Sequence, residues 1–255
     1  QVNNDMTQGN VFRTLLSFAM PLILTGLLQQ IYYIADSVIV GNLLGEGALA
    51  AVGVTTPILN VFIFITIGLV SGYTILLSQF YGAKEYQKIS RLSNTFLMLT
   101  MIFACVIAVL GFFLKQDILA LLNTPVEVLK PSGDYLAVVF CGIPFMVLYN
   151  LLSSMLRSVG DSKTPLYAIV LSTAVNIVLD LTFIKVFAWG IEGAAIATVI
   201  SQAISCLFLL RLIYRDHPFF RITFRKGRWD WALFRESIKL GLPRVLQSSI
   251  ASIGS

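Results

Sequence analysis

The chain has 255 residues, of which 57% are hydrophobic and only 12% are charged, and its mean hydropathy is +0.84. Soluble domains carry about a quarter charged residues, so this composition excludes an ordinary soluble protein and indicates a polytopic membrane protein. The net charge of +5 does not indicate nucleic-acid binding, because the basic residues lie in short connections between apolar runs.

The apolar runs, taken in chain order, predict the transmembrane helices, each of which needs about 20 residues. We expect spans over residues 14–41, 56–80, 92–114, 135–156, 166–189 and 193–212. Residues 47–55 are expected to lie at the membrane interface, and Pro125 and Pro131 in a polar linker. A further apolar run begins near Ile238 and is too short for a span by Ser255, so we expect the chain to be incomplete.

These spans predict an all-α integral membrane fold with three parts. Residues 1–212 would form a six-helix bundle, residues 213–239 a cytoplasmic basic connection, and residues 240–255 the start of a second bundle. Basic residues favour the cytoplasmic side of a membrane. With the N-terminus in the cytoplasm, most of the 18 Lys and Arg residues lie in inner segments, and the outer ones are Lys115, Lys130 and Lys185.

A faint internal repeat accompanies the seventh run. Phe12 and Pro21 correspond in spacing to Phe234 and Pro243, and both segments are basic entries into a proline-bearing span. Six spans separate them, which would make the two halves parallel repeats. The repeat predicts an intact protein of twelve helices in two bundles, with a ligand path between them.

Two acidic residues lie deep within apolar runs, Asp36 in the first expected span and Asp180 in the fifth. A carboxylate inside a membrane costs several kcal/mol unless it is protonated, paired or hydrated, so each indicates a functional site. Asn176 precedes Asp180 by one helical turn and shares its face. At about 1.5 Å per residue, both aspartates lie in the outer half of the bilayer, and Thr198 of the sixth span reaches the same layer.

Neighbouring carboxylates away from bulk water rarely both ionise, so such a pair can bind and release a proton. It could equally hold Na+, with Asn176 and Thr198 contributing oxygens. The alternatives are that an aspartate faces a watery vestibule or pairs with a basic residue, and that Asn176 and Thr198 only join helices.

Other polar and aromatic residues in the spans could line a substrate cavity, although each could instead be an interhelical contact or an interface anchor. They are Gln29, Tyr33, Asn60, Tyr149, Asn150 and Gln202. Pro21 removes one backbone hydrogen bond inside the first span and predicts a bend there. The connection RSVGDSKTP, residues 157–165, is either a cytoplasmic gate or a turn with a surface ion pair between Arg157 and Asp161.

Motifs of enzymes are absent from the sequence. It contains no GxSxG turn, no Walker phosphate loop, no HExxH and no CxxC, and His217 is its single histidine. The three cysteines lie in apolar runs, where they resemble small apolar fillers. We therefore expect no enzyme activity, no catalytic residues and no organic cofactor.

An ordered set of motifs resembles the multidrug and toxic compound extrusion (MATE) family, in its N-terminal half. The motifs cover essentially the whole chain and are Pro21, DSVIVG (36–41), QFYGA (79–83), RSVGDSKTP (157–165), NIVLD (176–180), GIEGAAIATVIS (190–201) and KLGLP (239–243). The resemblance implies the N-lobe of a two-lobe, twelve-helix secondary transporter. Such transporters export organic cations, drugs or other amphipathic compounds in exchange for H+ or Na+.

The resemblance also implies a coupling-ion site in this lobe. Asp36, Asn176 and Asp180 match its acidic and amide residues, Thr198 matches the hydroxyl of the sixth helix, and Tyr135 matches a tyrosine present in part of the family. The expected partners are the lipid bilayer of a bacterial-type plasma membrane, an organic cation or drug, and the missing C-lobe. The alternatives are a flippase for lipid-linked sugars or other lipids, and a non-transporting membrane scaffold fragment.

Overall fold

The computed structural model describes residues 11–220 and 230–253, and these residues form helices joined by short turns. Seven α-helices follow one another, with a π-helical segment (η1) after α5 and a short 3₁₀ helix (η2) after α6. In chain order the elements are α1 (Val11–Leu44), α2 (Glu46–Gly82), α3 (Tyr86–Leu121), α4 (Val126–Ser158), α5 (Lys163–Asp180), η1 (Leu181–Val186), α6 (Gly190–Asp216), η2 (Pro218–Phe220) and α7 (Trp231–Ile253).

Six of the described helices, α1 to α6, are long and apolar enough to cross a membrane, as the apolar runs predicted. Their outward faces carry exposed large apolar side chains, such as Phe113, Val178 and Leu207. A soluble protein would bury such side chains, whereas lipid tails solvate them. The predicted all-α integral membrane bundle is therefore confirmed.

The helices extend further than the apolar runs predicted. Residues 47–55 do not form a separate interfacial segment, because α2 runs without interruption from Glu46 to Gly82 and contains Pro57. Pro131 lies inside α4 rather than in a linker, and only residues 122–125 separate α3 from α4. A helix satisfies its own backbone hydrogen bonds, so it continues beyond the hydrocarbon core where the sequence turns polar.

The beginning of α7 at Trp231 lies inside the range predicted as the basic connection. Asp230 explains this position, because its carboxylate oxygen Oδ1 accepts a hydrogen bond from the Leu233 backbone N–H at 3.1 Å. Aspartate is among the preferred residues at the N-terminus of a helix for this reason. Thr95 of α3 holds the same residue, accepting a hydrogen bond from the Asp230 N–H at 3.0 Å. The part of the predicted connection at 221–229 lies outside the described residues.

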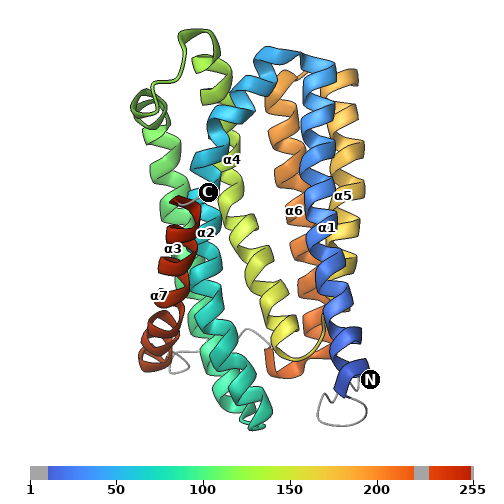
Figure 1. Cartoon of the computed structure of the whole chain (residues 1–255), viewed down its shortest axis with the longest axis vertical. Coiled ribbons are helices and arrows are strands. Elements are labelled where there is room, and N and C mark those ends of the chain that lie inside the picture. The colour runs from blue at the N-terminus through green and yellow to red at the C-terminus, as the bar shows by residue number, and fades with distance from the viewer. Residues whose placement is uncertain (1–10, 221–229, 254–255) are drawn as a thin grey trace.

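The helices form two groups on either side of α4 (Figure 1). Helices α1, α5 and α6 pack together on one side, and α2, α3 and α7 lie on the other. Helix α4 packs against α2, α3 and α6, and it carries many of the largest buried residues, including Phe140, Leu151 and Met155. The group of α1, α5 and α6 is the one that positions the polar residues of the spans.

Helix α7 packs closely along α2. The close approach depends on two glycines: a Cβ atom added to Gly72 would meet the backbone of Ser237 and Gly241, and one added to Gly241 would meet the carbonyl of Gly68. Small residues allow such backbone contact between helices in membranes. This contact attaches the beginning of the seventh apolar run to the first bundle.

Candidate functional site

The polar residues predicted from separate spans meet between α1, α5 and α6. Asn176 and Asp180 on α5 are completely buried, at 0% exposure, and Asp36 on α1 is half-buried. The two carboxyl groups lie within electrostatic reach of each other. The depth estimate placed these residues in one layer, and the packing of α1 against α5 and α6 brings them together within it.

Hydroxyl groups connect the three helices at this layer. Tyr32 Oη of α1 donates a hydrogen bond to Thr198 Oγ1 of α6 at 3.2 Å, and Asn176 Nδ2 of α5 donates to the same oxygen at 3.4 Å. Tyr135 of α4 is buried within electrostatic reach of both Asp36 and Asp180. All five predicted members of the site therefore gather around one centre.

Several oxygens of this centre lack a hydrogen-bond donor. Among the described residues, Asp36 Oδ1, Asn176 Oδ1 and both carboxylate oxygens of Asp180 are buried without any hydrogen-bond partner. Buried polar atoms are nearly always satisfied in folded proteins, so orphaned ones indicate a group that binds there. Four converging oxygens, two carboxylates among them, suit a proton or a hard cation such as Na+.

Tyr32 is a member of the site that the sequence prediction missed. Its signal was present, because Tyr32 precedes Asp36 by four residues and so shares its face of α1. The π-helical segment that follows Asp180 was also missed. Such segments are often found at functional sites, but nothing in the pattern of residues 181–186 distinguished them from ordinary helix.

A small cavity of about 60 Å³ lies in the bundle next to Tyr32. Five of the six predicted cavity residues line it, together with Tyr32, Met146, Ile169 and Ser172; the five are Gln29, Tyr33, Tyr149, Asn150 and Gln202. A space of this size can hold a few water molecules but no drug, which needs roughly 300 Å³ or more. Tyr149 Oη is buried without a partner among the described residues, as expected beside a hydrated space.

Asn60 is the predicted cavity residue that the structure does not bring to this cavity. It is exposed on α2, one turn after the exposed Thr56, and no residue of α2 lines this cavity. Pro21 lies within α1, which continues through it as helix. Its carbonyl accepts a hydrogen bond from Thr25 Oγ1 at 2.7 Å.

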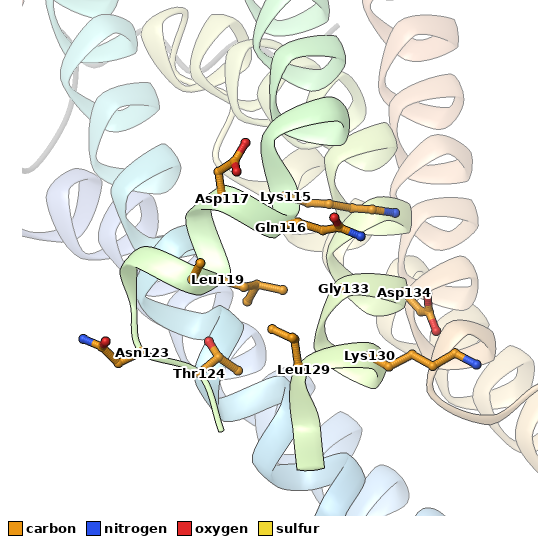
Figure 2. A pocket seen from close by; sticks show the side chains of 11 residues that line it. Lys115, Gln116, Asp117, Leu119, Asn123, Thr124, Leu129, Lys130, Gly133 and Asp134 are labelled. Carbon is orange, nitrogen blue, oxygen red and sulfur yellow. The ribbon is translucent and has the colours of Figure 1, made fainter. Parts of the chain in front are cut away.

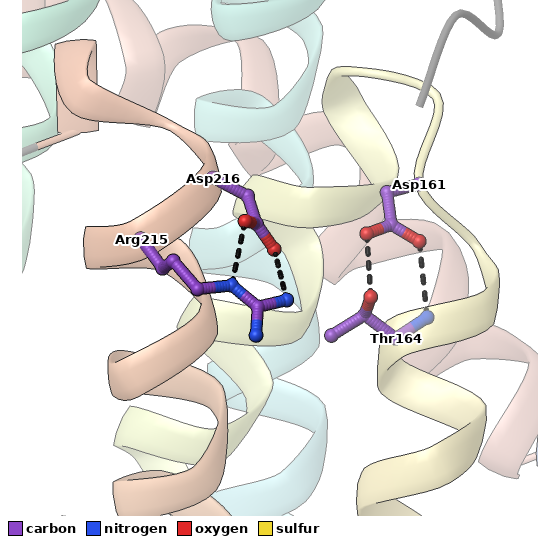
Figure 3. A network of polar contacts seen from close by, with 4 residues as sticks. All are labelled: Asp161, Thr164, Arg215 and Asp216. Carbon is purple, nitrogen blue, oxygen red and sulfur yellow. Dashed lines mark hydrogen bonds and ion pairs between the residues drawn. The ribbon is translucent and has the colours of Figure 1, made fainter. Parts of the chain in front are cut away.

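The connection between α4 and α5 does not contain the anticipated ion pair. Asp161 instead caps α5, accepting hydrogen bonds from the backbone N–H groups of Lys163 and Thr164 and from the Thr164 hydroxyl at 2.6 Å (Figure 3). Arg157 donates to Ser154 Oγ on its own helix. The ion pair drawn beside them joins Arg215 and Asp216 at 2.8 Å, and its exposure gives it little stabilising value.

Comparison with known proteins decides the family. The MatE family model matches residues 21–182, a stretch that includes Asp36, Asn176 and Asp180. The chain belongs to the MatE family.

Relatives of this MatE chain include the probable multidrug resistance protein YoeA of Bacillus subtilis (strain 168), which is 35% identical over 99% of the chain and 56% of its own length. Two solved structures, described as MATE in the bent conformation and MATE in the straight conformation, match with TM-scores of 0.89 and 0.88 at 25% identity, covering 99% of this chain and 56% of theirs. The chain spans about half the length of the curated relatives it matches.

Proposed function

We propose that this MatE chain is the N-lobe of a cation-coupled antiporter that exports organic cations, drugs or other amphipathic compounds. The observation that carries the proposal is the Asp36–Asp180 pair, in which Asp36 Oδ1 and both carboxylate oxygens of Asp180 are buried without a hydrogen-bond partner among the described residues. Unpartnered carboxylate oxygens bind a proton or Na+ favourably, and the oxygens of Asn176 and Thr198 complete the set. The printed name of YoeA supports the multidrug part of the proposal.

We expect alternating access because the coupling ion and the substrate compete for the same layer of the bundle. When a proton or Na+ occupies the pair, α1 and α5 are held together through Asp36 and Asp180; when it leaves, the like charges repel and the contact loosens. Pro21, whose missing N–H weakens α1 one-third of the way along, gives this helix a position at which to bend. The existence of bent and straight forms among MATE crystal structures supports such a movement.

The substrate would reach the carboxylate site along a path that passes Tyr33. Its ring lines the internal cavity and also a wider cleft of about 530 Å³ along the second half of α1, to which Glu46 at the start of α2 contributes an acidic side chain. A cleft of this size accepts a drug-sized molecule, and an aromatic ring beside a carboxylate favours a cation. A second six-helix bundle would cover this cleft, and the whole would lie in the plasma membrane with its N-terminus in the cytoplasm.

The decisive experiment measures efflux of ethidium from vesicles containing the full-length protein, first under a proton gradient and then under a sodium gradient. Efflux driven by one gradient should fall at least tenfold in Asp36→Asn and in Asp180→Asn. Glu85→Gln, which changes an exposed carboxylate in the same way, serves as the matched control. Undiminished efflux in the Asp36→Asn, Asp180→Asn double variant would falsify the coupling role.

A further inference from the structure

A wide hollow, lined by none of the residues of the carboxylate site, lies at the α3–α4 turn. It has a volume of about 820 Å³ and lies between the end of α3 and the beginning of α4. Its wall contains the charged residues Lys115, Asp117, Lys130 and Asp134. Nothing in the proposed antiport cycle uses this hollow, whose lining comes from α3, α4 and the turn between them.

Two lysines and an aspartate converge there. Figure 2 shows Lys115 and Lys130 extending toward the same side, with Asp134 beside them and the Gln116 amide next to Lys115. None of the three charged side chains forms an ion pair with another residue of the described chain; the Lys115 ammonium instead lies 4.9 Å from the centre of the Phe112 ring. The ammonium groups of Lys115 and Lys130 and the carboxylate of Asp134 thus lie on one side of the hollow, and the Asp117 carboxylate points away from them (Figure 2).

The hollow lies at the membrane surface. Helix α3 has 36 residues, a length of about 54 Å at about 1.5 Å per residue, whereas the hydrocarbon core is about 30 Å thick. The end of α3 must therefore extend into the headgroup layer. Around the charged hollow, Phe113, Leu121 and Val126 expose apolar side chains, at 75%, 83% and 83%. Charges bordered by exposed apolar surface are the arrangement that one phospholipid molecule contacts with its headgroup and its chains.

We propose that this hollow binds the headgroup of a zwitterionic phospholipid with a primary amine, phosphatidylethanolamine, as a resident lipid and not as cargo. Lys115, Lys130 and the Gln116 amide bind the phosphate, and Asp134 accepts hydrogen bonds from the ammonium group. An anionic lipid without an amine leaves Asp134 facing a phosphate, which is unfavourable. Phosphatidylcholine satisfies the lysines, but its quaternary ammonium has no N–H to donate to Asp134.

The test is native mass spectrometry of the delipidated full-length protein, titrated separately with phosphatidylethanolamine, phosphatidylcholine and phosphatidylglycerol. We expect phosphatidylethanolamine to bind most tightly. The Lys115→Ala, Lys130→Ala double variant should bind it about tenfold more weakly. Asp134→Asn should lose only the preference over phosphatidylcholine. The matched controls change exposed residues that do not line the hollow: Lys185→Ala for the lysine variants and Glu127→Gln for Asp134→Asn.

Equal binding of the three lipids, or unchanged binding in the lysine double variant, overturns the proposal. Glycerophosphoethanolamine, which has the same headgroup and no acyl chains, separates a lipid from a soluble ligand. Weak competition by this compound supports a lipid site, and competition as strong as that of the lipid itself overturns it. Ethidium efflux is not measured in this experiment, so its outcome is independent of the proposed transport function.

Discussion

Single hydroxyl groups hold the carboxylate site together across three helices. Thr198 Oγ1 accepts hydrogen bonds from both Tyr32 and Asn176, so one small side chain of α6 orients residues of α1 and α5. Asp36 and Asp180 were predicted from the cost of burying charge, which needs only their position in the chain. Tyr32 was not, because a tyrosine in an apolar run is equally typical of an interface anchor.

Replacing Tyr32 by phenylalanine should weaken ion coupling without unfolding the bundle. The substitution keeps the ring and removes the hydroxyl that orients Thr198, a loss of about 1 kcal/mol, or several-fold in ion affinity. The pH or sodium concentration that half-saturates ethidium efflux should shift accordingly. Tyr167→Phe, on an exposed face of α5, is the control. A half-saturation point that stays the same in Tyr32→Phe would argue against a role for this hydroxyl.

His217, which directly follows α6, should make the stability of the fold depend on pH. Burial lowers the pKa of His217 below its ordinary value of 6.5, and the nearby carboxylates of Asp161 and Asp216 oppose this only in part. The folded state therefore favours neutral histidine. This contribution is complete above the unfolded pKa, about 6.5, and is lost as pH falls through the lower folded pKa.

His217→Gln should reduce the loss of stability on acidification, because glutamine does not titrate. The measurement is thermal unfolding of the full-length protein at pH 7.5 and pH 5. The difference in midpoint between the two pH values should be smaller in the variant than in the unmodified protein. An identical difference in both proteins would assign the acid sensitivity to other groups.

Capping residues decide where the helices begin, and close contacts decide how they pack. Helix α5 begins at Lys163 because Asp161 satisfies backbone N–H groups of its first turn, and α7 begins at Trp231 because Asp230 does the same. Both aspartates were visible in the sequence. The first was expected in a gate or in a surface ion pair, and the second was overlooked, since hydropathy reports apolar length and not capping.

Asp161→Ala should destabilise the beginning of α5 by about 1 kcal/mol, because the N–H groups of Lys163 and Thr164 lose their acceptor. Asp161→Asn should retain most of this stability, since an amide oxygen still accepts hydrogen bonds. Thermal unfolding of both variants measures the difference. If Asp161→Ala and Asp161→Asn unfold at the same temperature, Asp161 does not stabilise α5 by capping it.

Gly72→Ala should separate α7 from α2. The added methyl group meets backbone atoms of Ser237 and Gly241, which cannot move aside as a side chain would, and the cost should be about 2 kcal/mol. Gly53→Ala lies on the same helix with no atom within 4 Å of the new Cβ, so it should be neutral or stabilising by up to about 1 kcal/mol. Thermal unfolding compares Gly72→Ala with Gly53→Ala. Equal unfolding midpoints would show that α2 and α7 are not in close contact at Gly72.

The whole molecule is a membrane bundle, and the distribution of its charges predicts its orientation. Lys and Arg concentrate at the ends of helices that lead to the predicted cytoplasmic side. Cysteines introduced at Leu122, in the α3–α4 turn, and at Lys88, near the beginning of α3, should therefore label differently. The background is a protein in which Cys105, Cys141 and Cys206 are replaced by alanine.

A membrane-impermeant maleimide added to intact cells should modify Leu122→Cys and should modify Lys88→Cys only after permeabilisation. Both positions are exposed, so access depends on the side of the membrane and not on burial. The reverse pattern would invert the orientation. It would also place the proposed lipid site in the inner leaflet.

The sequence by itself determined the class of protein and the six apolar helices, and it predicted a common depth for Asp36, Asn176, Asp180 and Thr198. These depend on hydropathy, on the rise of a helix and on the cost of buried charge, which are local properties of the chain. Only the tertiary structure decided which helices are neighbours. It brought Tyr32 to Thr198, left Asn60 outside the cavity, and gathered Lys115 and Lys130 around one hollow. In lipid, apolar faces have no preferred partner, so neighbours are selected by close packing of small residues and by polar contacts between residues distant in sequence.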